Sequence, residues 1–297
     1  MFVEHADAIN NAAIRSVRRM RNLSIWQYTV RFMFSADLLA GKTAIVTGGG
    51  TGLGLAMATK FAELGANVVL ASRSEEHLAA GASAVSAAAP HAGVLTVATD
   101  VRKPEDVDRM VDAAVAKFGR VDILINNAAG NFVCKAEDLS PNGWNSVINI
   151  VLNGSFYCSR AVGRHMIASG QGGSIVSIVA TYAWTGSAGT IHSAAAKAGV
   201  LAMTQTLAVE WARHKIRVNA VAPGPIESPG AAKQLWASEE AVARITEMVP
   251  LKRWGKPEEI ADAVTFLVSP QSGYITGDVL TVDGGTWLGR GPFGFMS

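Results

Sequence analysis

The strongest constraint on the fold is a glycine-rich turn placed between a short apolar segment and an apolar helix. Residues 42–47 read as a β-strand, residues 48–54 form the turn, and the helical pattern then continues to Leu64. In this context glycines let the backbone approach a pyrophosphate, whose charge the helix N-terminus holds. The sequence therefore predicts a dinucleotide-binding unit with contacts from Gly48, Thr51, Gly52, Leu53 and Gly54.

The same alternation of strands and helices continues along the chain. A series of this kind is typical of a parallel sheet with crossover helices. We therefore predict an α/β fold, a Rossmann-like doubly wound parallel sheet with helices on both faces, in a single domain over residues 38–297. The expected strands cover residues 42–47, 67–71, 94–98, 121–125, 173–178, 217–222 and 278–282, and the later helices cover 75–88, 104–118, 142–168, 193–214 and 258–268.

The end of the second strand predicts which cofactor is bound. Ser72, Arg73 and Ser74 stand there. An acidic residue would bind the ribose of NAD, whereas an arginine flanked by hydroxyl groups suits a 2′-phosphate, so NADPH/NADP+ is expected. Because ligands of open α/β sheets lie beyond the carboxyl ends of the strands, further contacts are expected at Asp100, Val101, Asn127, Ala128, Pro223, Gly224 and Ile226.

Composition argues against several other classes of protein. Charged residues make up 17% of the 297 residues and the formal net charge is +2, so nucleic acid is not an expected partner. Cys134 and Cys158 form no CxxC pair and no Cys/His cluster, so no metal site is expected and a reducing, cytoplasmic location is indicated. Gly, Ser and Thr interrupt the uncharged run 165–196, so no membrane span is expected.

The first 37 residues differ in character from the rest of the chain. They are rich in arginine, with apolar residues between the charges, and we predict an N-terminal arm or extension. A transit segment over residues 1–35 is the alternative, although Glu4 and Asp7 argue against it. Only that alternative would imply a mitochondrial location.

A second candidate site lies between Ser177 and Lys197, where an apolar strand leads through a Gly/Ser/Thr-rich loop into an Ala-rich helix. Ser193 and Lys197 stand four residues apart and share a helix face. Lys197 is the first charged residue after Arg164, and a cation in an uncharged region needs a partner or a task. The alternative is a solvated lysine on a helix surface.

Four motifs together resemble the short-chain dehydrogenase/reductase family over residues 38–286. They are Thr47–Gly54, Asn126–Gly130, Lys197 and Pro223–Gly224. The resemblance implies a nicotinamide cofactor and, as is usual in the family, a homotetramer.

The family's usual catalytic set is only partly present. That set is an asparagine in the fourth helix, a serine after the fifth strand and a Tyr-x-x-x-Lys motif. Here the first three positions hold Val151, Ala180 and Ser193, and only the lysine, Lys197, is retained. The chain is thus either an inactive cofactor-binding relative or an enzyme whose catalytic groups have moved.

Other motifs resemble the mitochondrial-type NADPH-dependent 2,4-dienoyl-CoA reductases of this family, in which the tyrosine lies eleven residues before the serine. Tyr182 precedes Ser193 by that spacing. The resemblance implies a catalytic set of Asn131, Tyr182, Ser193 and Lys197, an acyl-CoA substrate and a role in the β-oxidation of unsaturated fatty acids. Tyr182 and Asn131 would bind the thioester oxygen, Lys197 the nicotinamide ribose, and Ser193 would support the tyrosine. Without the resemblance, Asn131 would be read as a residue that caps its own turn.

An acyl-CoA substrate also requires cations for its phosphates. Residues 226–256 read as irregular and are the expected substrate lid. The candidate cations in the lid are Lys233, Arg244, Lys252 and Arg253.

Two other functions are compatible with the sequence. One is reduction of a trans-2-enoyl-CoA or of a carbonyl group such as a 3-ketoacyl thioester, with Tyr182 as the acid. The other is a non-catalytic NADPH-binding scaffold, which the loss of three usual catalytic positions favours.

Overall fold

The computed structural model describes residues 34–227 and 239–289. The chain divides into two units, Met1–Leu38 and Leu39–Ser297. All the elements given below belong to the second unit. The predicted N-terminal arm lies outside the described residues, apart from residues 34–37.

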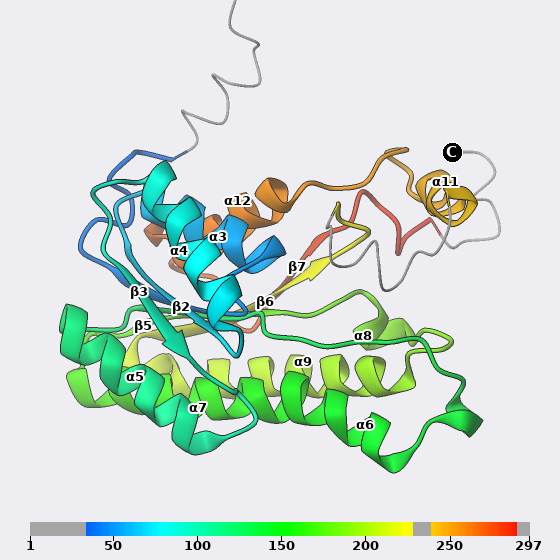
Figure 1. The fold of residues 1–297 in the computed structure, drawn as a ribbon, viewed down its shortest axis with the longest axis horizontal. Coiled ribbons are helices and arrows are strands. Elements are labelled where there is room, and N and C mark those ends of the chain that lie inside the picture. The colour runs from blue at the N-terminus through cyan, green and yellow to red at the C-terminus, as the bar shows by residue number, and fades with distance from the viewer. Residues whose placement is uncertain (1–33, 228–238, 290–297) are drawn as a thin grey trace, which may run out of the picture. The chain divides into compact units, whose positions relative to one another are not determined.

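One seven-stranded sheet organises the second unit (Figure 1). Its strands are all parallel and follow the order β3-β2-β1-β4-β5-β6-β7, so the order reverses between β1 and β4. This confirms the predicted Rossmann-like doubly wound sheet. The strands are β1 (Thr43–Thr47), β2 (Asn67–Ser72), β3 (Val94–Ala98), β4 (Ile123–Asn126), β5 (Gly173–Ile178), β6 (Ile216–Pro223) and β7 (Val279–Val282).

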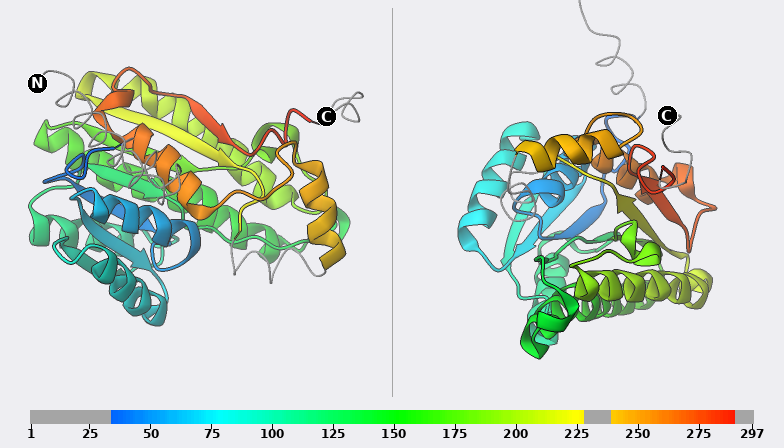
Figure 2. Two further views of the ribbon diagram at one scale, coloured as in Figure 1. Left: turned by 90° about the horizontal axis from the view of Figure 1, so that it is seen from above. Right: turned by 90° about the vertical axis from the view of Figure 1, so that its right-hand side faces the viewer.

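Helices cover both faces of this sheet, as Figures 1 and 2 show. One layer holds α3 (Gly52–Glu63), α4 (Glu75–Ala88) and α12 (Pro257–Val268). The other holds α5 (Pro104–Phe118), α7 (Gly154–Ser169) and α9 (Ile191–Trp211). The shorter elements are η2 (Ala136–Asp138), α6 (Pro141–Ile148), η3 (Asn149–Asn153), α8 (Tyr182–Thr185), η4 (Ala212–His214), α11 (Glu239–Met248) and η5 (Pro270–Ser272).

The central strands are buried because helices cover both of their faces. Every residue of β1 and of β4 is buried. Strands in this position read as continuous apolar runs rather than alternating ones, which is why the sequence pattern identified them. On the α5 and α7 face, Ile45, Leu124 and Ile175 pack into one apolar cluster that extends to Met110 and Val162.

Two predicted elements need correction. The region 226–256 is predicted to be irregular, but it contains the helix α11, in which Ala241, Ile245 and Met248 follow the three- and four-residue spacing of an amphipathic helix. The predicted helix 142–168 is not one regular α-helix, since the π-helical turn η3 separates α6 from α7.

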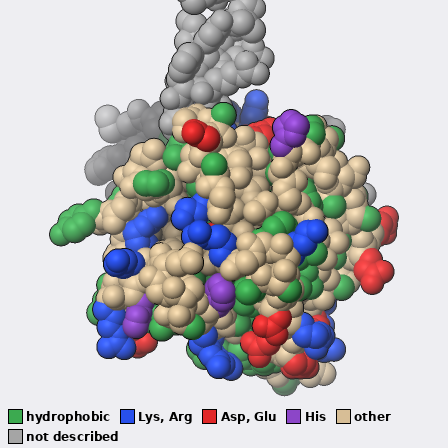
Figure 3. Space-filling model, turned by 90° about the vertical axis from the view of Figure 1, so that its left-hand side faces the viewer, with side chains coloured by type: hydrophobic (Ala, Val, Ile, Leu, Met, Phe, Trp, Pro, Cys, Tyr) green, Lys and Arg blue, Asp and Glu red, His purple; other side chains and the backbone are tan. Residues whose placement is uncertain are grey.

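No helix in residues 34–227 and 239–289 has both the length and the apolar character needed to cross a bilayer. The face of the molecule seen in Figure 3 carries basic and acidic side chains together, and neither sign covers it continuously.

Candidate active site

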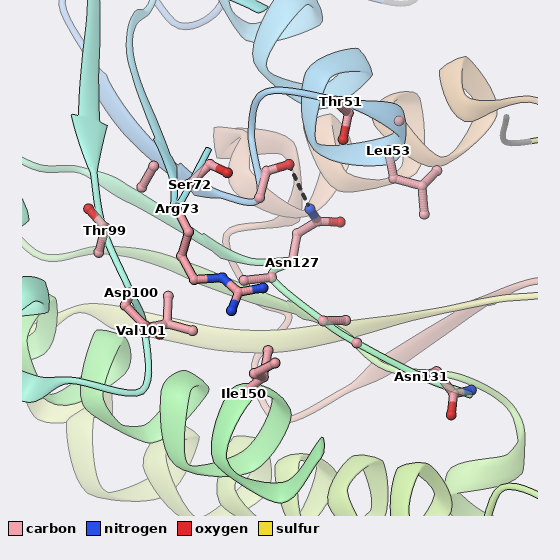
Figure 4. A pocket seen from close by; sticks show the side chains of 16 residues that line it. Thr51, Leu53, Ser72, Arg73, Thr99, Asp100, Val101, Asn127, Asn131 and Ile150 are labelled. Carbon is pink, nitrogen blue, oxygen red and sulfur yellow. Dashed lines mark hydrogen bonds between the residues drawn. The ribbon is translucent and has the colours of Figure 1, made fainter. Parts of the chain in front are cut away.

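A cavity of about 430 Å³ lies at the carboxyl ends of β1 to β4, where the strand order reverses (Figure 4). This is the place at which open α/β sheets bind ligands. Ten of the predicted cofactor positions line it: Gly48, Thr51, Gly52, Leu53, Ser72, Arg73, Asp100, Val101, Asn127 and Ala128. The other lining residues are Ala71, Thr99, Ala129, Gly130, Ile150 and the predicted catalytic residue Asn131.

The glycine turn is packed so tightly that side chains are excluded from it. A Cβ atom on Gly54 would lie 2.2 Å from the carbonyl oxygen of Gly48 and 2.7 Å from the side-chain nitrogen of Asn127. Asn127 Nδ2 donates to the carbonyl oxygen of Thr47 over 2.9 Å, which ties the turn to the end of β4. Gly54 therefore shapes the turn without lining the cavity, and the exposed backbone suits the close approach of a pyrophosphate.

Arg73 brings a positive charge into the cavity, as Figure 4 shows. Nearby, Asp100 accepts a hydrogen bond of 2.8 Å from Arg102 Nε. That hydrogen bond lowers the pKa of Asp100, and the charge of Arg73 contributes in the same direction. A guanidinium at the end of β2 suits the 2′-phosphate of NADPH. Ser74 instead caps α4, since its Oγ accepts from the His77 amide over 3.2 Å.

The remaining predicted cofactor positions lie elsewhere. Pro223 and Gly224 lie at the end of β6, where the Gly224 amide donates to the Val282 carbonyl over 3.0 Å. Ile226 lines a second cavity of about 490 Å³ between β6, β7 and the start of α12, together with Glu259. Both cavities are lined by residues that follow the ends of strands. The sequence therefore could not tell that Ile226 lines the second cavity rather than the first.

Some residues that line the first cavity were not predicted from the sequence, such as Thr99 and Ile150. Their only signal in the sequence was their position after a strand or within a helix.

Tyr182 and Ser193 meet although they belong to different helices. Tyr182 begins α8, Ser193 lies in the first turn of α9, and their hydroxyl oxygens are 3.0 Å apart. Burial raises the pKa of Tyr182 above its ordinary value, against a smaller opposite effect from Ser193. The tyrosine is therefore a neutral phenol at pH 7 that can donate a hydrogen bond.

Lys197 lies one helical turn beyond Ser193 and is only 7% exposed. Its ammonium group donates to the carbonyl oxygen of Ile178 at the end of β5. Burial lowers the pKa of Lys197 to about 8. The lysine is thus a buried cation beside the Tyr182–Ser193 pair, which excludes the alternative of a solvated surface residue.

Asn131 lies on the loop after β4, and Figure 4 shows it at the opposite end of the cavity from Thr99. Its Oδ1 accepts from the Phe132 amide over 3.0 Å. This bond orients the side-chain amide so that its N–H groups are left to donate to another group. The two positions where the family usually has a helix asparagine and a serine hold Val151, which is buried, and Ala180.

The four candidate cations of the lid differ in their surroundings. Lys233 lies outside the described residues, and Arg244 is exposed on α11. Lys252 lies 3.5 Å from a Glu247 carboxylate oxygen, and Arg253 makes two hydrogen bonds to Glu259 of 2.8 and 2.6 Å. A CoA phosphate would therefore compete with carboxylates for the last two cations.

The buried lysine makes stability depend on pH in a predictable direction. The pKa of Lys197 is about 8 in the folded protein and 10.5 is the ordinary value, so between these pH values only the unfolded chain holds the proton. The free energy of unfolding is then expected to rise by about 3 kcal/mol as pH increases from 8 to 10.5. Denaturant titrations of the cofactor-free protein would measure this rise against Lys197→Met, which lacks the titrating group. Equal pH slopes in the two proteins would contradict the prediction.

Comparisons with known proteins agree with the fold. The chain matches the family model described as Enoyl-(Acyl carrier protein) reductase over residues 48–286. The crystal structure of a short chain dehydrogenase from Bacillus anthracis is 52% identical, with a TM-score of 0.76, and the match covers 85% of this chain and 99% of that chain.

Two relatives carry names that specify a reaction. The Bacillus subtilis protein named "Probable 2,4-dienoyl-CoA reductase", with (2E)-enoyl-CoA as product, is 52% identical over 85% of this chain and 99% of its own length. The Danio rerio protein named "Peroxisomal 2,4-dienoyl-CoA reductase", with (3E)-enoyl-CoA as product, is 43% identical over 86% of this chain and 85% of its own length.

Proposed function

Since the chain belongs to the short-chain dehydrogenase/reductase family and is an oxidoreductase, we propose that it reduces 2,4-dienoyl-CoA thioesters with NADPH. The observation that carries this proposal is the Tyr182–Ser193 pair. Ser193 stands where the family usually has its tyrosine, and the Tyr182 hydroxyl lies 3.0 Å from it. A tyrosine hydroxyl is thus present beside Ser193, but it comes from Tyr182 and not from the position where the family usually has its catalytic tyrosine.

The moved phenol suits reduction of a carbon–carbon double bond. When a ketone is reduced, the oxygen that takes up a proton is bound to the carbon that receives hydride. In a dienoyl thioester the hydride, which NADPH supplies when bound, adds at the far end of the conjugated system. The negative charge then develops on the thioester oxygen, several bonds away, so the hydrogen-bond donors must also stand farther away.

Each catalytic candidate has a place in this scheme. Tyr182 and Asn131 are assigned to the thioester oxygen, because a neutral phenol and an amide N–H both donate. Ser193 orients the phenol through their hydrogen bond. Lys197 is assigned to the ribose and, as a buried cation, to stabilising the negative charge.

The cavity supports NADPH as the cofactor. Arg73 enters it from the end of β2, and the turn around Gly54 offers its backbone for a pyrophosphate. The CoA part of the substrate would extend toward the lid, where Arg244, Lys252 and Arg253 are the candidate cations that the structure describes. The names of the relatives suggest two products, and the position of the remaining double bond depends on which carbon of the dienolate is protonated.

The test is NADPH oxidation with a medium-chain 2,4-dienoyl-CoA, a 2-enoyl-CoA and a 3-ketoacyl-CoA. We expect rapid turnover of the dienoyl ester and little of the other two. Preferential turnover of the ketoacyl ester would contradict the mechanism and support a carbonyl reductase. NADPH binding without turnover of any of the three would support a scaffold.

A further inference from the structure

His192 is a buried histidine that the scheme above does not use. Its exposed fraction is 0%, and neither ring nitrogen has a hydrogen-bond partner among the described residues. Of the residues the structure describes, it alone has two buried side-chain polar atoms without a partner. Buried polar groups are nearly always hydrogen-bonded, and each exception costs stability. An apolar residue would fill this position without that cost.

His192 lies next to Ser193 in the chain, and its ring packs against the residue that follows Asn131. His192 directly precedes Ser193 in the first turn of α9. Its ring meets the ring of Phe132 edge to face, with centroids 4.4 Å apart and planes at 74°. Phe132 in turn follows Asn131 and donates its amide to the Asn131 side chain. The histidine is therefore adjacent in space or in sequence to both sides of the site.

The proposed reaction has a step without an assigned residue. Hydride addition leaves a dienolate, which must take up one proton on carbon to become the enoyl-CoA product. Tyr182 and Asn131 are assigned to the thioester oxygen and Ser193 to the phenol, so none of the three is assigned to the carbon that takes up the proton. A neutral imidazole has one N–H donor and one acceptor nitrogen, so it can release a proton from one side and accept one on the other.

We infer that His192 relays a solvent-derived proton to the dienolate carbon and so determines the position of the double bond in the product. This inference rests on the proposed function. The N–H bond of one ring nitrogen breaks as the new C–H bond forms, and the enolate electrons restore the thioester C=O bond. The other ring nitrogen takes a proton from water, which leaves the opposite tautomer of a neutral imidazole and a hydroxide ion that a solvent proton neutralises. Protonation at C2 yields the 3-enoyl thioester, and protonation at C4 yields the 2-enoyl thioester.

Two variants separate a relay from a structural role. His192→Phe keeps a ring against Phe132 and removes both nitrogens. His192→Gln keeps a donor and an acceptor, but an amide does not pass a proton between them. Thermal unfolding and NADPH binding of both variants check that the fold and the cofactor site are retained.

The experiment is single-turnover reduction of a 2,4-dienoyl-CoA in H2O and D2O, with chromatographic separation of the 2-enoyl and 3-enoyl products. For both variants we expect product formation to slow by about 10²-fold, as for loss of a general acid, and the product ratio to move from the wild-type value. The ratio of the rates in H2O and D2O should also differ between each variant and the wild type.

Three results would count against the relay. An unchanged product ratio in His192→Phe would overturn it, whatever happens to the rate, because a structural defect slows turnover without redirecting the proton. Restoration of the wild-type ratio by His192→Gln would reduce the role to hydrogen bonding and overturn the relay as well. If the wild type does not reduce the dienoyl ester at all, the proposed function fails and the role of His192 fails with it.

Discussion

Replacing Tyr182 with phenylalanine is expected to lower kcat for a 2,4-dienoyl-CoA by about 10²- to 10³-fold, the usual effect of removing one donor from an oxyanion site. The phenol is neutral at pH 7, since the ordinary pKa of tyrosine is 10 and burial raises it further, so it donates rather than accepts at the thioester oxygen. Steady-state kinetics would measure the loss. NADPH binding, followed by fluorescence, should stay unchanged, since Tyr182 does not line the cofactor cavity.

The matched control is Ser193→Ala, which removes the partner hydroxyl and leaves the phenol in place. One neutral hydrogen bond is worth about 1 kcal/mol, so this variant should lose only about 5-fold in kcat. A Tyr182→Phe enzyme with full activity would refute the assignment of the phenol. A loss in Ser193→Ala as large as in Tyr182→Phe would make Ser193 the principal group instead.

Replacing Arg73 with glutamate is expected to raise KM for NADPH by about 10²-fold or more, because each charge-assisted hydrogen bond to a phosphate contributes about 1.5–3 kcal/mol and the new carboxylate repels the 2′-phosphate. The activity with NADH, which lacks that phosphate, should stay the same or increase. Initial rates with the two cofactors, measured with the same acyl-CoA, would give both values.

Arg109→Glu is the control for this experiment. It changes the net charge by the same amount, but Arg109 is exposed on α5 and bonds to Asp106 rather than lining the cavity. We expect its KM for NADPH to stay within a few-fold of the wild type. A proportional rise of KM for NADPH and NADH in Arg73→Glu would show that the guanidinium supports the cavity in general and does not read the 2′-phosphate.

Much of the fold could be predicted because its signals are local. The Gly48–Gly54 turn, the apolar runs of β1 and β4, and the regular alternation with helices are each contained in short segments. Backbone freedom and apolar period are properties of such segments, so they can be read without knowing what packs against them. The helix α11 carries a local signal of the same kind, since Ala241, Ile245 and Met248 recur at helical spacing, and the prediction of an irregular region 226–256 was wrong there.

In the candidate site, too, the features carried by short segments could be predicted from the sequence, and the contacts between elements could not. The sequence by itself determined the cofactor turn and the arginine after β2, because both follow directly from a strand end. The tertiary structure decided that Tyr182 and Ser193 touch, that Lys197 is buried with a lowered pKa, and that His192 has no partner among the described residues. Hydrogen-bond partners and desolvation depend on atoms brought in from other elements, and no short segment of sequence contains that information.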